Sequence, residues 1–138
     1  MNVVPLKQTV NKLIFIFLDG VGLGEDDADN PLATTGLPFL TSLLGAPLLK
    51  DLTVRQPQLL CQGIDACLGV AGIPQSATGQ TALLTGCNAA RHLGYHLPAF
   101  PNEALIELIQ QDSLLKRAKS RGLRATFANA YTPQGLVV

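Results

Sequence analysis

The chain has 138 residues, enough for one domain, and its 47% content of hydrophobic residues is sufficient for a core. Ten Lys and Arg residues balance ten Asp and Glu residues, so the net charge is zero and no basic run indicates a surface for nucleic acid or membranes. The longest purely apolar run, at residues 13–18, is much shorter than the ~20 residues of a membrane-spanning helix, and no signal-peptide pattern opens the chain, so we expect a cytoplasmic protein.

The apolar run at residues 13–18 reads LIFIFL and ends at Asp19-Gly20. A short, continuous apolar run of this kind is typical of a strand that is buried on both faces. We therefore expect Asp19 at the C-terminal end of a strand. A glycine-rich and then polar loop extends from there to Gly36.

Two helices are predicted in the middle of the chain. Pro38 can begin the first, which Gly45 ends. Residues 46–72 are interrupted by Pro and Gly, so we expect irregular structure there with one or two short strands. The second helix runs from about Gly79 to Thr85, and the glycine that follows ends it.

Helices and a strand are also predicted in the last third of the chain. Asn102 can cap a helix whose apolar residues, from Leu105 onwards, repeat with helical spacing. Ser113 can cap another that ends near Gly122, and residues 125–130 have the pattern of a strand. Alternation of buried strands with helices predicts an α/β fold with a mostly parallel sheet, whose ligands lie beyond the carboxyl ends of the strands.

The LDGVGLG segment around Asp19 invites two functional interpretations. A dinucleotide-binding loop is disfavoured, because its third glycine would fall at Glu25 and the acidic residues 25–27 would repel a pyrophosphate. A carboxylate beside glycines at a strand end instead suits a divalent cation, although an aspartate in this position can also simply cap a turn. The acidic residues 25–29 lack the spacing of an EF-hand and are typical of a solvated loop.

Residues 72–86 read GIPQSATGQTALLTG and contain four hydroxyl side chains, three of them at or near the beginning of a helix. Ser76 is positioned either to cap that helix or to attack a phosphate, whose charge a helix N-terminus favours. A serine hydroxyl is almost wholly protonated at pH 7, and a bound metal ion could activate it. Thr78 and Thr81 are candidates for capping or for phosphate contact.

His92 and His96 stand four residues apart, which on a helix would bring both imidazoles to one face. Gly94 between them and Pro98 after them disfavour such a helix. Three roles stay open for this segment: metal ligation by the histidines, substrate contact by Arg91, His92 or His96, and a structural role at the surface.

Together, the segments LIFIFLDGVGLG, GIPQSATGQTALLTG and FANAYTP resemble the alkaline phosphatase superfamily. The similarity is greatest to its metalloenzyme branch, which includes cofactor-independent phosphoglycerate mutase and phosphopentomutase. The resemblance implies an α/β/α sandwich with two divalent ions, Zn, Mn or Mg. It matches Asp19 to a metal ligand and Ser76 to a metal-bound nucleophile that is transiently phosphorylated. In the mutase branch the serine follows Asn and precedes Glu-Val-Gly-His, whereas here Gln75 and Ala77 flank it, which leaves mutase, phosphatase, diesterase and sulfatase chemistry open.

The resemblance further implies that residues 1–138 are a single, truncated N-terminal part of such a domain, a partial α/β/α sandwich whose other Asp and His ligands lie downstream. We expect a small-molecule phosphate ester as substrate, with Thr78, Arg91 and His92 as its contacts. A missing C-terminal portion or a partner chain would complete the site. The alternative is an inactive fragment, or a phosphate-binding subunit that requires a partner.

Overall fold

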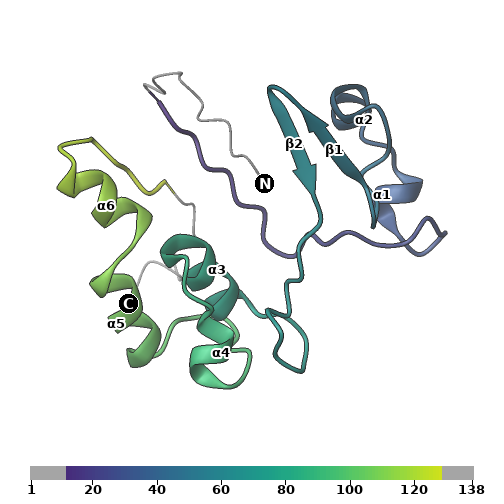
Figure 1. The fold of residues 1–138 in the computed structure, drawn as a ribbon. Coiled ribbons are helices and arrows are strands. Elements are labelled where there is room, and N and C mark those ends of the chain that lie inside the picture. Colours follow the sequence, from purple (N-terminus) through teal and green to yellow (C-terminus); the bar gives the residue numbers. More distant parts are fainter. Residues whose placement is uncertain (1–11, 129–138) are drawn as a thin grey trace. The chain divides into compact units, whose positions relative to one another are not determined.

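The computed structural model describes residues 12–128 of the chain. The chain divides into two compact units, Met1–Gly63 and Ile64–Val138 (Figure 1). Among the described residues, no helix is both long enough and apolar enough to cross a lipid bilayer.

The first unit contains two short helices and a hairpin. Their bounds are α1 Pro31–Thr34, α2 Pro38–Leu44, β1 Thr53–Gln56 and β2 Leu59–Gln62. Each helix begins at a proline, whose fixed φ suits the first helical position. The prediction for α2 is confirmed, and Gly45 ends it in a left-handed conformation with φ +78°. Helix α1 was not predicted; it forms because the Asn30 side chain accepts a hydrogen bond from the Leu32 N–H at 3.0 Å.

Strands β1 and β2 pair antiparallel, with Thr53 opposite Gln62 and Gln56 opposite Leu59. Pro57 and Gln58 form the turn between them, where proline costs no ladder hydrogen bond. The expectation of one or two short strands within residues 46–72 is therefore confirmed.

The second unit is helical. Its helices are α3 Ser76–Thr85, α4 Ala89–Leu93, α5 Glu103–Gln111 and α6 Leu114–Ser120. Helix α3 begins three residues earlier than predicted and ends at Gly86, as expected. The predicted caps are also confirmed, because Asn102 accepts from the Leu105 N–H at 3.1 Å and Ser113 from the Lys116 N–H at 3.3 Å.

The core of the second unit lies where α3 packs against α4, α5 and α6. Ala77 of α3, Ala89 of α4 and Leu105 of α5 form its buried centre, and Leu105 is completely inaccessible to solvent. Burial of one leucine side chain contributes about 1.5–3 kcal/mol to folding. Partly buried apolar residues surround this centre: Ala82, Leu93, Leu97 and Leu108.

The junction between α5 and α6 is held by two basic side chains. Lys116 Nζ donates to the carbonyl oxygens of Gln110 and Gln111, at 2.7 and 3.1 Å, and so satisfies acceptors at the end of α5. Arg117 Nε donates to both carboxylate oxygens of Asp112, at 2.8 and 2.9 Å. This hydrogen bonding lowers the pKa of Asp112 below its usual value.

The predicted α/β fold with a mostly parallel sheet is wrong. Over residues 12–128 the only sheet is the antiparallel pair β1-β2. Residues 13–18 form no strand, and their side chains are exposed. Their apolar pattern indicates a tendency to be buried, but a strand also needs a neighbour to pair its N–H and C=O groups, and the described residues provide none.

The second predicted strand also differs from expectation. Residues 125–128 have no regular secondary structure. Residues 129 and 130, and with them most of the FANAYTP segment, lie outside the described residues. The two strands that were expected to begin a parallel sheet are therefore not observed in the described part of the chain.

The stability of the second unit should depend on the Asn102 cap. We expect Asn102→Ala to lower the free energy of unfolding by about 1 kcal/mol, because the Leu105 N–H loses its acceptor. Asn102→Asp should retain the stability, since a carboxylate accepts the same bond. Urea denaturation measures both, with Gln111→Ala at the exposed end of α5 as control. Equal losses in Asn102→Ala and Gln111→Ala would contradict the assignment.

Candidate functional site

Ser76 is the first residue of α3 and is partly buried. The N-cap is Gln75, whose backbone is extended at φ −130° and ψ 153° and whose side chain makes no capping hydrogen bond. The first turn of α3 carries no acidic residue. The positive end of the helix dipole is therefore not neutralised by a carboxylate of its own first turn, and this favours a bound anion.

The beginning of α3 is tied to the segment that follows α4. The Ala77 N–H donates to the Leu97 carbonyl at 3.2 Å. His96 Nε2 lies 3.2 Å from the Val70 carbonyl oxygen. A Cβ at Gly72, which has φ +114°, would approach the His96 ring to 3.4 Å. These contacts hold both the start of the helix and the chain that leads into it.

The loop before the motif is organised by Asp65, a residue that the sequence analysis did not single out. Its two carboxylate oxygens accept hydrogen bonds from the N–H groups of Cys67 and Gly69, at 2.9 and 3.1 Å. The Asn88 side chain, which caps α4, also donates to the Leu68 carbonyl at 2.8 Å. An aspartate followed closely by glycine is a signal for such a turn.

The threonines of α3 form its buried face. Thr78 and Thr81 are 0% and 2% exposed, and Thr85 is 5% exposed. The Thr78 hydroxyl donates to the Gln75 carbonyl at 3.2 Å and the Thr85 hydroxyl to the Thr81 carbonyl at 2.7 Å. Neither Thr78 nor Thr81 caps the helix, so the capping alternative is wrong for both. Substrate contact by Thr78 stays a prediction, and the Thr78 hydroxyl is buried in this structure.

The two histidines do not share a helix. Helix α4 ends at Gly94, which has φ +82°, so His92 lies in its last turn and His96 beyond it. Glycine is favoured here because the left-handed conformation is strained for other residues. Arg91 and His92 are exposed, whereas His96 is half-buried against Val70. His96 therefore has a structural contact, and Arg91 and His92 stay candidate substrate contacts.

Asp19 lies on a turn rather than at the end of a strand. Its Oδ1 accepts a hydrogen bond from the Gly20 N–H at 2.9 Å, and Gly20 has φ +71°. The alternative of an aspartate that caps a turn is therefore realised. Asp19 belongs to the first unit and Ser76 to the second, so the convergence of their side-chain oxygens stays a prediction.

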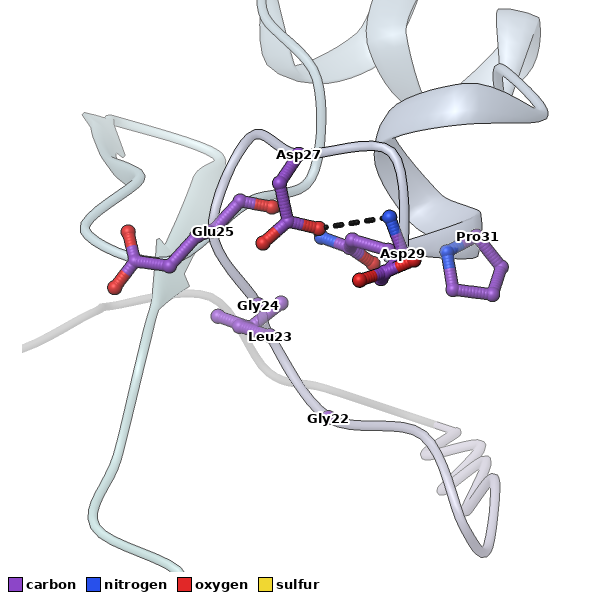
Figure 2. A pocket seen from close by; sticks show the side chains of 8 residues that line it. Gly22, Leu23, Gly24, Glu25, Asp27, Asp29 and Pro31 are labelled. Atoms are coloured by element: carbon purple, nitrogen blue, oxygen red, sulfur yellow. Dashed lines mark hydrogen bonds between the residues drawn. The ribbon is translucent and has the colours of Figure 1, made fainter.

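An open hollow lies in the acidic loop of the first unit (Figure 2). Its lining comprises Gly22, Leu23, Gly24, Glu25, Asp27, Asp29, Asn30 and Pro31. Figure 2 shows the Glu25 carboxylate pointing away from those of Asp27 and Asp29. Asp27 Oδ1 accepts a hydrogen bond from the Asp29 N–H at 3.0 Å. The acidic side chains of this loop thus do not converge on one point.

Glu25 is used within the first unit. It forms an ion pair with Lys50, and the hydrogen bond from Lys50 to this carboxylate raises the Lys50 pKa. The Asn30 side chain donates to the Glu25 carbonyl at 2.7 Å. A Cβ at Gly24 would come within 2.9 Å of the same Asn30 side chain, so only glycine fits there without movement.

The candidate residues are divided between the two units. Ser76, Thr78, Arg91 and His92 belong to the second unit and Asp19 to the first. Over residues 12–128, no three or more His, Cys, Asp or Glu side chains are grouped so that they could hold a metal ion. Comparisons with protein-family models, with curated proteins and with solved structures gave no match for this chain.

The contact of His96 with Val70 predicts a local effect on the motif. We expect His96→Ala to speed amide hydrogen exchange at Ala77 and Gly79 by about fivefold, because loss of one hydrogen bond costs roughly 1 kcal/mol. His92→Ala removes the same side chain from an exposed position and should leave exchange unchanged. Equal protection in the two variants would show that His96 does not hold the motif.

Proposed function

We propose that Ser76 is the nucleophile of a metal-dependent phosphoryl transfer from a phosphate ester. The observation that carries this proposal is the position of Ser76 as the first residue of a ten-residue helix whose first turn has no acidic residue. The N–H groups and the dipole of such a helix end attract a phosphate. The similarity of residues 72–86 to the alkaline phosphatase superfamily supports the same role for Ser76.

In the proposed reaction, Ser76 Oγ forms a bond to phosphorus while the bond from phosphorus to the ester oxygen breaks. Ser76 loses its proton, and the departing alkoxide takes one up. A water molecule then attacks the phosphoserine and releases inorganic phosphate, which restores the serine hydroxyl. If a second hydroxyl attacks instead of water, the phosphoryl group is transferred and the reaction is that of a mutase.

Asp19 and Ser76 provide oxygen donors, which suit divalent ions such as Mg²⁺ or Mn²⁺ and are also accepted by Zn²⁺. A bound ion supplies charge that lowers the pKa of the serine hydroxyl and neutralises the phosphate oxygens. Two side chains are fewer than the roughly four to six ligands of such ions, and residues 12–128 contain no group of three. The proposal therefore requires further ligands from the substrate or from a partner.

The same shortage of ligands favours a second candidate function. In this alternative, the beginning of α3 binds a phosphate group without chemistry, and a partner chain carries the reaction. Binding of inorganic phosphate in the absence of metal, together with no covalent product, would support it.

The decisive test is to trap the covalent product. The full chain is incubated with an aryl phosphate and Mn²⁺ or Zn²⁺, quenched in acid and analysed by peptide mass spectrometry. We expect phosphate on Ser76 in only a fraction of the chains, because residues 12–128 provide an incomplete ligand set for the ion, and none in Ser76→Ala. Asp19→Asn should reduce the labelling by about tenfold or more, as changes around metal ligands commonly do.

Two variants control for the general effects of substitution. Ser120→Ala removes another serine hydroxyl, and Asp26→Asn removes a carboxylate from the exposed acidic loop; both should be labelled like the unmodified chain. Phosphate on Thr78 with an unmodified Ser76, or labelling that does not depend on the metal, would contradict the proposal.

A further inference from the structure

The apolar run at residues 13–18 of the first unit is exposed and has no part in the reaction proposed for Ser76. Its side chains are exposed as follows: Leu13 82%, Ile14 83%, Phe15 53%, Ile16 77%, Phe17 41% and Leu18 67%. Alternate residues of extended chain point to opposite faces, and here both sets are exposed. A continuous exposed apolar surface of this kind marks a site of interaction.

Among residues 12–128, the run pairs with no other strand. Figure 1 shows it as a purple stretch without helix or arrow, and within residues 12–128 only β1 and β2 form a sheet. It contains no Gly, Pro or charge, and its central residues are β-branched or aromatic. Six-residue segments with these properties pair readily with a second strand.

The order of residues in the run favours a second copy of the same run as that strand. Antiparallel pairing about the midpoint between Phe15 and Ile16 brings branched aliphatic residues opposite aromatic ones, and such pairs stabilise a sheet. The resulting pairs between the two copies are Leu13 with Leu18, Ile14 with Phe17, and Phe15 with Ile16.

The charges at the two ends of the run select the same arrangement. Lys12 precedes the run and Asp19 follows it, and both are exposed. In the antiparallel register, Lys12 of one copy lies opposite Asp19 of the other, at both ends of the pair. A parallel pair in register would instead place Lys12 beside Lys12 and Asp19 beside Asp19, which is unfavourable.

We propose that two copies of this chain associate through an antiparallel pair of strands formed by residues 13–18. The pair has a two-fold axis between Phe15 and Ile16, so each copy contributes the same surface and the assembly closes as a dimer. Association covers apolar side chains that the single chain exposes. This proposal goes beyond the function proposed for Ser76 and is tested without substrate.

Sedimentation velocity of the full chain tests the proposal over about 1–100 μM, the range in which weak dimers form. A chelator is included so that no metal occupies Asp19. We expect a monomer at the lowest concentration and a dimer at the highest. Ile16→Lys should leave only monomer, while Ile73→Lys, which alters an isoleucine of matched exposure in the second unit, should dimerise normally.

Charge reversal tests the orientation of the strands. Lys12→Glu or Asp19→Lys should each weaken dimerisation by about tenfold, since two cross-strand pairs per dimer become repulsive. The combined variant restores both pairs and should recover the original affinity. Lys119→Glu, an exposed charge reversal in α6, should have no effect.

Several outcomes would overturn the proposal. A chain that stays monomeric throughout the range excludes it, and a dimer that survives Ile16→Lys uses another surface. Failure of the combined charge variant to restore association excludes the antiparallel register. Open-ended assemblies of increasing size exclude a closed pair. Circular dichroism checks that Ile16→Lys is folded, and its spectrum should match that of the unmodified chain because the single chain exposes this side chain.

Discussion

The close packing of α3 against its neighbours depends on the small side chains of its buried face. Ala77, Thr78 and Thr81 are almost completely buried, and none of them is larger than threonine. A helix with such a face can approach α4 and α5 closely, and Leu105 fills the centre. The hydrogen bond from Ala77 to the Leu97 carbonyl then holds the first turn in place. Ser76 begins the same turn, so its position is set by this packing.

This arrangement explains why hydroxyl residues are concentrated at the motif. The threonines are small, and inside the helix their hydroxyls bond to carbonyl oxygens, as Thr78 and Thr85 do. They can therefore be buried without leaving a polar group unpaired. Ser76 differs from them because it stands at the helix start, where a phosphate is favoured. Packing therefore accounts for the threonines, and a chemical role is proposed for the serine alone among the nucleophile candidates.

Local features of the fold could be predicted from the sequence. The caps at Asn102 and Ser113 and the end of α3 at Gly86 were predicted correctly, because each depends on side chains or φ angles within a few residues. The strand predicted at residues 13–18 is not observed, because strand formation depends on a partner elsewhere in the chain. The apolar pattern indicated that residues 13–18 tend to be buried, but it did not indicate which segment would pair with them.

The candidate site was predicted in part for the same reason. The position of Ser76 at a helix start follows from local sequence, although the helix begins earlier than expected. The contact of His96 joins residues 26 positions apart, and no spacing rule indicated it. The contacts of Asp65 are local, and the glycine that follows it closely was the available signal for that turn. Asp19 was expected at the end of a strand and lies on a turn, and metal ligation by Asp19 stays a proposal.

A nuclear magnetic resonance titration with Mn²⁺ and inorganic phosphate tests most directly whether Asp19 and Ser76 share a metal ion. Bound Mn²⁺ broadens only the signals of nearby nuclei, so it reports which amides surround the ion. If Asp19 and Ser76 share an ion, the amide signals of Gly20 and Ala77 should broaden together at the same low concentration of Mn²⁺. Broadening that is confined to the acidic loop at residues 25–29, with Ala77 unaffected, would contradict a shared ion.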